Sequence, residues 1–98
     1  MKFEILFTED ASDQFQYLER AKDKKTVFKA VQKALAFMEV NIKHPSLNTH
    51  EYNGLVGPKN EKIFESYAQN NTPGAYRIFW YYGPGKNFIT ILDISPHP

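Results

Sequence analysis

The apolar positions in the first half of the chain predict one strand followed by two helices. Phe3, Ile5 and Phe7 alternate along residues 3–7, which is typical of a half-buried strand. Thr8 is of a type that caps helices, and the helix expected after it carries its apolar positions at Ala11, Phe15 and Leu18. A polar segment at 21–25 precedes a longer helix with a stripe formed by Val27, Val31, Ala34, Leu35, Met38 and Ile42. The short connection predicts an antiparallel helical hairpin.

The second half of the chain predicts a loop and three strands. Residues 45–60 are punctuated by Gly, Pro and Asn, so we expect a loop there. Residues 62–68, 75–82 and 88–94 are each typical of a strand, and short turns between them predict an antiparallel meander. The expected fold class is α+β in a single domain over residues 1–98. It consists of an N-terminal strand, a two-helix antiparallel hairpin and a three-stranded antiparallel meander, with the helices packed on one face of the sheet.

Strand alternation also assigns side chains to faces of this sheet. In the last strand it places Ile89, Ile91, Asp93, Ser95 and His97 on one face, opposite Phe88, Thr90, Leu92 and Ile94. In the strand before it, Arg77 lies opposite Ile78 and Trp80. If the apolar faces pack on the helices, one group of polar and ionisable side chains shares the other side: Glu65, Tyr67, Arg77, Asp93 and His97.

Composition narrows the class of protein. The formal net charge of the 98 residues is +1, so charge alone does not indicate a nucleic-acid binder. There are no cysteines, which excludes disulfides and cysteine–zinc sites, and the histidines have no metal-binding spacing. No nucleotide-binding glycine motif occurs, so neither cofactor nor metal is expected. No apolar stretch is long enough to span a bilayer, and we expect a cytoplasmic protein with no membrane partner. Lysines are concentrated in residues 22–43. They are either a solvated face of a helix or a stripe that binds phosphates.

Arg77 and His97 are the residues of greatest chemical interest. An arginine offers a planar fork of donors that suits phosphate, and a histidine gives or takes a proton near neutral pH. With a carboxylate or phenol, these groups suit cleavage of an RNA phosphodiester, in which the ribose 2′-OH is the nucleophile. Two plainer interpretations remain open, because Arg77 can pair with Asp93 across strands and His97 can be a frayed terminal residue. His44 is more typical of a helix end, and nothing singles out His50.

The sequence resembles the RelE/ParE superfamily of small bacterial toxins from type II toxin–antitoxin modules. The resemblance rests on the order of elements and on the segments HPSLNTHEYNGLVG, GAYRIFWYYG and ILDISPHP. It implies the RelE/ParE fold. The RelE branch cleaves mRNA in the ribosomal A site without a metal, by attack of the 2′-OH that leaves a cyclic phosphate.

The resemblance also implies roles for residues. Arg77 matches the strand arginine that binds the scissile phosphate, and His97 falls at the position of the general acid. Glu65 and Tyr67 stand where RelE itself carries two lysines, one of them the base. Glu51, in the linker, is an alternative base. Contacts to RNA and the ribosome are expected from Lys24, Lys25, Lys29, Lys33, Lys43 and Tyr81.

The expected function is therefore a ribosome-dependent mRNA endoribonuclease toxin that inhibits translation. One alternative is a ParE-like toxin that inhibits DNA gyrase without catalysis. The other is a catalytically degenerate binding module. The expected partners are a cognate antitoxin, the ribosome and mRNA, and a homodimer or a toxin–antitoxin hetero-oligomer is the expected assembly.

Overall fold

The computed structural model describes residues 2–97; Met1 and Pro98, the two ends of the expected domain, lie outside the described residues. The helices are α1 (Glu9–Arg20) and α2 (Lys25–Val40), with short 3-10 turns η1 (Lys22–Lys24) and η2 (Pro45–Leu47) after them. The strands are β1 (Glu4–Phe7), β2 (His50–Val56), β3 (Lys62–Tyr67), β4 (Tyr76–Tyr82) and β5 (Phe88–Pro96). The α+β class is as predicted, and the expected strand, two helices and three meander strands occur in that order as β1, α1, α2, β3, β4 and β5.

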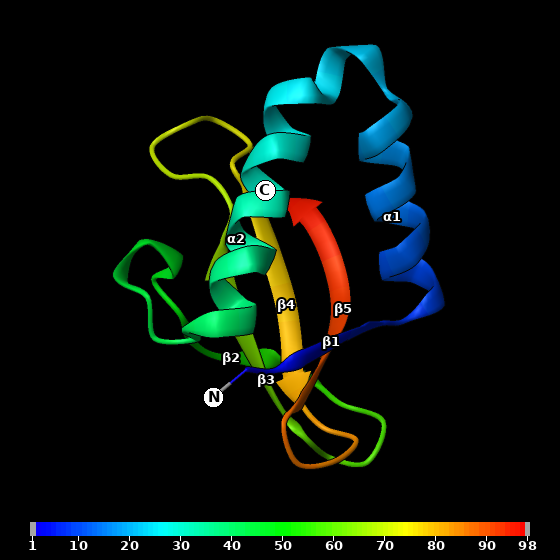
Figure 1. Cartoon of the computed structure of the whole chain (residues 1–98), viewed down its shortest axis with the longest axis vertical. Coiled ribbons are helices and arrows are strands. Elements are labelled where there is room, and N and C mark those ends of the chain that lie inside the picture. Colours follow the sequence, from blue (N-terminus) through cyan, green and yellow to red (C-terminus); the bar gives the residue numbers. More distant parts are fainter. Residues whose placement is uncertain (1, 98) are drawn as a thin grey trace.

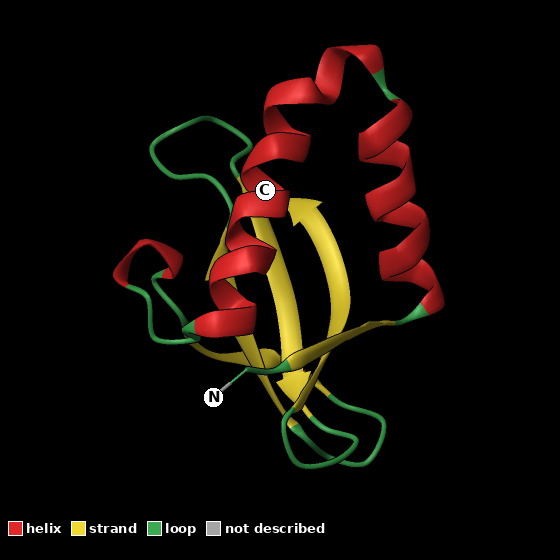
Figure 2. Ribbon diagram, viewed as in Figure 1, coloured by secondary structure: helices red, strands yellow, loops and turns green. Residues whose placement is uncertain are grey.

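The two helices run in opposite directions over the same face of the sheet, as expected (Figures 1 and 2). Thr8 is the N-cap of α1, because its side chain accepts a hydrogen bond from the Ala11 N–H at 3.2 Å. The stripe of α2 is confirmed, with its buried positions at Val31, Ala34, Leu35 and Met38. The helix ends at Val40, two residues before Ile42, which still packs against the core.

The sheet has five strands in the order β1-β5-β4-β3-β2. β1 runs parallel to β5, and the other pairs are antiparallel. The prediction of a loop over residues 45–60 was wrong in part, since this segment contains η2 and the edge strand β2. All seven residues of β2 are exposed, and its register with β3 shifts between Tyr52 and Val56. An edge strand of this kind leaves no alternation of apolar residues in the sequence.

The core lies between the helices and one face of the sheet. Trp80 at its centre is fully buried, and Phe64 stacks on it with ring centroids 5.0 Å apart. The side chains that pack around them come from both helices, η2, β4 and β5: Ala11, Leu18, Val31, Ala34, Leu35, Met38, Leu47, Ile78, Ile89, Ile91 and Ile94. The opposite face of the central strands is therefore not covered by the helices.

A β-bulge in β5 corrects the predicted assignment of faces. Phe79 pairs with Asp93 but Trp80 pairs with Ile91, so Leu92 is an extra residue without a partner in β4. Ile91 consequently faces the helices, and Asp93 faces the other side of the sheet. The prediction that Ile89 and Ile91 share a face with Asp93 was wrong, because simple alternation does not allow for the extra residue. Thr8 braces the bulge, donating from its N–H to the Ile91 carbonyl and from Oγ1 to the Leu92 carbonyl.

One hydrogen-bonded chain inside the core gives a test of the fold. The Trp80 Nε1–H donates to Ser66 Oγ at 2.9 Å, and Ser66 Oγ lies 2.7 Å from Thr49 Oγ1. Ser66→Ala leaves the buried indole N–H without an acceptor, so we expect the free energy of unfolding to fall by about 1–3 kcal/mol in urea titrations. Thr49→Val is the matched control, because it keeps that acceptor. An equal loss in both variants would contradict this account.

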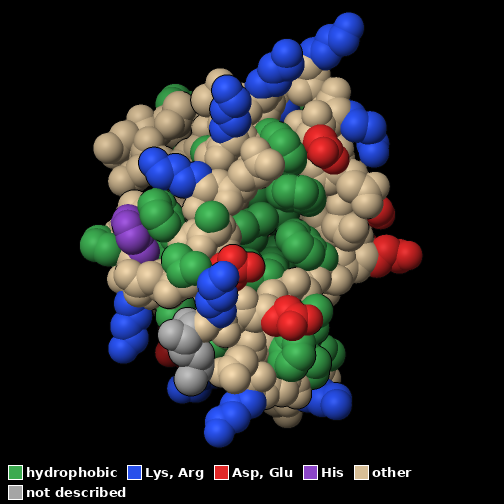
Figure 3. Space-filling model, in the orientation of Figure 1, with side chains coloured by type: hydrophobic (Ala, Val, Ile, Leu, Met, Phe, Trp, Pro, Cys, Tyr) green, Lys and Arg blue, Asp and Glu red, His purple; other side chains and the backbone are tan. Residues whose placement is uncertain are grey.

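Figure 3 shows the face that carries the helices, with Lys and Arg side chains scattered around a central apolar area. The expected lysines Lys25, Lys29 and Lys33 are exposed on α2, and Lys43 is exposed in the turn that follows it. Within residues 2–97, neither helix combines the length and the apolar character that a membrane span requires.

Candidate functional site

The sheet face away from the helices contains a hollow of about 240 Å³. Its walls come from three adjacent central strands, the edge strand β2 and the chain end after β5. The lining side chains are Tyr52, Leu55, Glu65, Arg77, Phe79, Asp93, Ser95, Pro96 and His97. Three of the five expected catalytic residues, Glu65, Arg77 and His97, thus border one space.

Strand register explains why these side chains meet. His50, Glu65, Phe79 and Asp93 form one row across four strands, since each is the register partner of the next. Tyr67, Arg77 and Ser95 form the next row on the same face. Their placement together was predicted from alternation, and the bulge at Leu92 is what brings Asp93 and Ser95 to this face.

Arg77 is held in a fixed position at the edge of the hollow. It is only 9% exposed, its Nη1 donates to the Gln69 carbonyl at 2.7 Å, and its guanidinium carbon lies 3.6 Å from the centre of the Tyr67 ring. Nε lies 3.6 Å from Glu65 Oε2, which makes an ion pair but no hydrogen bond, and it is buried without a hydrogen-bond partner. The guanidinium is thus preorganised by stacking and by one carbonyl, as a binding group for an anion requires.

The alternative pairing of Arg77 with Asp93 does not occur. Asp93 instead accepts hydrogen bonds from Gln14 Nε2 at 2.6 Å and from Ser95 Oγ at 2.5 Å. Gln14 Oε1 in turn accepts from the Ile94 N–H at 2.7 Å, so a side chain of α1 joins the edge of β5 beyond the last residue paired with β1. These contacts fix the strand segment that leads to His97. The His97 N–H donates to the Ala75 carbonyl at 2.8 Å, which continues the pairing of β4 and β5 past Pro96.

His50 belongs to the same network, although nothing in the sequence singled it out. Its Nε2 lies 2.7 Å from Glu65 Oε1, and its Nδ1 lies 2.9 Å from the Asn48 carbonyl. Both partners are acceptors when Glu65 is ionised, so a doubly protonated ring satisfies both. Glu65, 7% exposed, therefore stands between two cationic or potentially cationic groups, His50 and Arg77. Recognition of β2 would have revealed the pair, since residues 50 and 65 are register partners across the turn at 57–61.

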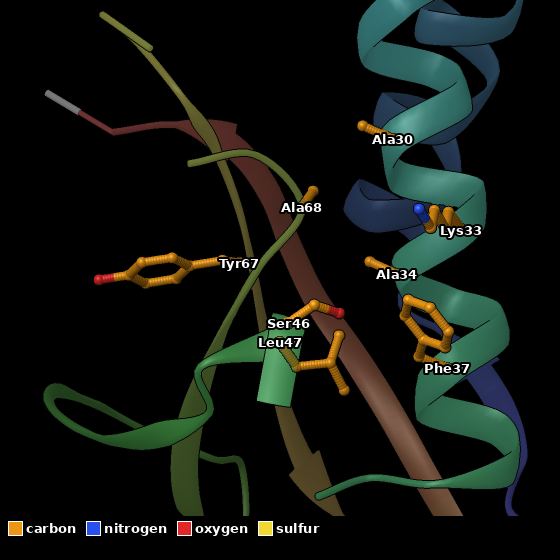
Figure 4. Close-up of a pocket in the computed structure, with 8 residues that line it drawn as sticks. All are labelled: Ala30, Lys33, Ala34, Phe37, Ser46, Leu47, Tyr67 and Ala68. Carbon is orange, nitrogen blue, oxygen red and sulfur yellow. The ribbon is translucent and has the colours of Figure 1, made fainter. Parts of the chain in front are cut away.

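Tyr67 shows how the two faces of β3 are divided. In Figure 4 its ring points away from α2, while the small hollow of about 110 Å³ between α2 and η2 is lined by Ala34, Phe37 and Leu47 among others. The ring is the surface on which Arg77 stacks, and the His50 ring packs edge-on against it with the ring centroids 5.9 Å apart. Tyr67 therefore supports the site from beneath the arginine.

Other expected site residues lie apart from the hollow. Glu51 is the register partner of Phe64 and so points to the opposite face, where it lies 3.8 Å from Lys62 Nζ. Tyr81 faces the hollow's side of the sheet but is 7% exposed, which leaves little of its ring for contact with RNA. The lysines of α2 lie on the helix-covered side. Lys24, in η1, is only partly exposed.

The remaining ionisable groups of interest lie outside the hollow. Within residues 2–97, no three His, Asp or Glu side chains come close enough together to hold a metal ion. His44 accepts from the Ser46 N–H at 3.1 Å and stacks on Phe37, so it serves as the cap of η2. Burial raises the pKa of Tyr82 above its ordinary value of 10.0, and this side chain borders a separate hollow on the helix side.

Comparisons with known proteins identify the fold. No protein-family model matches the sequence, and no curated protein matches it either. The YoeB/ParE toxin from Agrobacterium tumefaciens is 8% identical, with a TM-score of 0.71 and each chain fully covered. The YoeB dimer from Staphylococcus aureus is 13% identical, with a TM-score of 0.65 and each chain fully covered.

A third solved structure is the archaeal RelE–RelB complex from Pyrococcus horikoshii OT3. It is 12% identical, with a TM-score of 0.64, and the match covers 98% of this chain and 96% of that one. At these identities the likeness concerns the fold. The chain has the fold of the YoeB, ParE and RelE toxins over essentially its whole length, which confirms the fold that the sequence motifs indicate.

Proposed function

We propose that this chain, which has the RelE/ParE fold, is the toxin of a type II toxin–antitoxin module and cleaves mRNA on the ribosome. The observation that carries the proposal is the hollow that Arg77, Glu65 and His97 border together. A phosphate-binding cation, a carboxylate and an imidazole are the groups that RNA cleavage by the 2′-OH needs, because the substrate supplies the nucleophile.

In the proposed reaction Arg77 binds a non-bridging oxygen of the scissile phosphate. Glu65 accepts the proton of the ribose 2′-OH as the 2′-oxygen attacks phosphorus. The bond from phosphorus to the 5′-oxygen breaks, and His97 donates a proton to that oxygen. The products are a 2′,3′-cyclic phosphate and a free 5′-OH. This scheme uses side chains alone.

Glu65 suits the role of base better than Glu51 for a geometric reason. Glu51 points to the other face of the sheet, whereas Glu65 borders the hollow beside Arg77. His50 holds the Glu65 carboxylate on the side away from the arginine and so orients it. The lysines of α2 are proposed to contact ribosomal RNA from the other side of the molecule, where backbone phosphates attract cations regardless of sequence.

We propose a cognate antitoxin as the protein partner. One structure of the same fold is a RelE–RelB complex, and another is a YoeB dimer. The apolar area between α1 and α2 in Figure 3 offers a surface for a helical antitoxin segment. Co-expression with each adjacent reading frame should rescue growth for one of them, and failure of every frame to rescue or bind would contradict the toxin proposal.

The experiment that tests the function is induction in bacteria with two readouts. We expect incorporation of labelled amino acids to stop within minutes, while a DNA-damage reporter stays silent. Primer extension should then reveal new 5′ ends within translated mRNA. Filamentation with an active DNA-damage reporter would overturn the proposal in favour of a gyrase inhibitor. Normal growth and translation would overturn it in favour of a binding module without catalysis.

A further inference from the structure

We infer that the hollow has a second half that stacks an RNA base, and that the ring of Tyr52 is its platform. This inference rests on the proposed function and adds a residue that decides how the substrate is held. The hollow is polar along β3, β4 and the chain end, where Glu65, Arg77 and His97 lie. The other lining side chains are the polar Asp93 and Ser95 of β5 and an apolar group, here called the apolar wall, which consists of Tyr52, Leu55, Phe79 and Pro96. An arginine and an exposed aromatic ring that line one hollow are a combination that binds single-stranded RNA.

Tyr52 is exposed yet held in place. The residue as a whole is 37% exposed, and its ring meets the Phe79 ring at a centroid distance of 5.0 Å with the planes inclined by 65°. Phe79 is itself fixed in the sheet between Glu65 and Asp93. Stacking on a prepositioned ring loses little conformational entropy, so this ring suits binding better than a freely rotating side chain would.

Gly54 explains the direction of the ring. A Cβ atom at position 54 would lie 2.7 Å from Tyr52 Cε2, Cζ and Oη, so the ring folds back along β2 over this glycine. The backbone at Gly54 does not require a glycine for conformational reasons, because its φ is not in the left-handed region. The missing side chain therefore makes room for the ring, and any larger residue must displace it.

The spacing of the two halves fits a nucleotide. Tyr52 pairs with Ile63, two residues before Glu65 and four before Tyr67, the register partner of Arg77. Four residues of strand cover about 13 Å. The Arg77 Nε lies 3.6 Å from Glu65 Oε2, the Tyr52 and Phe79 ring centroids lie 5.0 Å apart, and all four side chains line the same hollow. One nucleotide together with the two side chains spans such a gap.

The inferred recognition is tolerant of base identity. The apolar wall carries no ionised group, and stacking needs only the π-face that every base has. Removal of an aromatic platform typically weakens binding about 5- to 150-fold. We therefore expect Tyr52 to contribute affinity and positioning, and to contribute little preference among the four bases.

The test measures binding of two probes, adenosine 3′-monophosphate and inorganic phosphate, by NMR titration of the whole chain. Tyr52→Ala should weaken nucleotide binding about 5- to 150-fold and leave phosphate binding unchanged. Tyr52→Phe should behave like the parent. Gly54→Ala keeps the tyrosine but displaces its ring, so it should weaken nucleotide binding in the same direction as Tyr52→Ala.

The outcomes separate this inference from the proposed function. If Tyr52→Ala leaves nucleotide affinity unchanged while Arg77→Lys weakens both probes, stacking is wrong and the phosphate site stands. If neither probe binds the parent chain, the proposed site fails and the inference fails with it. If Tyr52→Ala changes only the binding of an antitoxin, this wall is a protein contact and the inference is overturned.

Discussion

Arg77→Lys is expected to slow single-turnover cleavage of mRNA on programmed ribosomes by about 10²- to 10³-fold. Lysine keeps the charge but lacks the planar fork, and a compact ammonium cannot both stack on Tyr67 and reach the Gln69 carbonyl as the guanidinium does. The phosphate would then be bound without fixed geometry. Arg20→Lys is the matched control, because Arg20 is the chain's other arginine and lies at the exposed end of α1.

Arg77→Ala should be more damaging, because it also affects the fold. It leaves the buried Glu65 carboxylate with His50 but without the guanidinium. Loss of one partner from a buried pair typically costs about 3 kcal/mol or more. Circular dichroism in urea should show this loss for Arg77→Ala and a much smaller one for Arg77→Lys. Wild-type cleavage by a folded Arg77→Lys variant would remove Arg77 from the phosphate site.

His97→Gln is expected to lower the same single-turnover rate by about 10²- to 10⁴-fold, which is the usual contribution of a general acid. Glutamine keeps a polar side chain of similar reach but has no proton to give. Ribosome binding should stay nearly intact. The backbone pairing of residue 97 with Ala75 does not involve the side chain, so glutamine keeps this hydrogen bond.

The pH dependence of the rate gives a second readout for His97. A general acid acts in its protonated form, so the parent rate should fall as pH rises. His97→Gln should flatten this dependence. His44→Gln is the control, because His44 caps η2 on the other side of the molecule. An unchanged rate and pH profile in His97→Gln would transfer the role of acid to Tyr67.

Much of the fold follows from local patterns in the sequence. Thr8, the α2 stripe and the strands around Ile78 and Trp80 were predictable because burial on one side imposes a period on the residues. β2 was not predictable in the same way, because an edge strand whose residues are all exposed has no such period. The pairing of β2 with β3 therefore becomes visible only in the three-dimensional structure.

The candidate site shows the same division. Arg77, Glu65 and His97 were assigned to one face by alternation, and the hollow brings them together. The ionic partner of Arg77 depends on side-chain conformation, which the sequence does not reveal. The sequence suggested Asp93, whereas the partner in the structure is Glu65. His50 and Tyr52 join the site only through the register of β2.

The bulge at Leu92 has a consequence for changes in chain length. β5 contains one residue more than its pairing with β4 requires. The strand can therefore lose one residue there and still pair with every residue of β4 that it pairs with now. Deletion of Leu92 would leave Ile91 toward the core and Asp93 toward the hollow. Deletion of Ile91 would let Leu92 take the core position opposite Trp80, and deletion of Asp93 would let Leu92 take the place opposite Phe79. A single-residue loss anywhere in 91–93 can therefore be absorbed by closing the bulge, and His97 would still arrive on the face where it lies now.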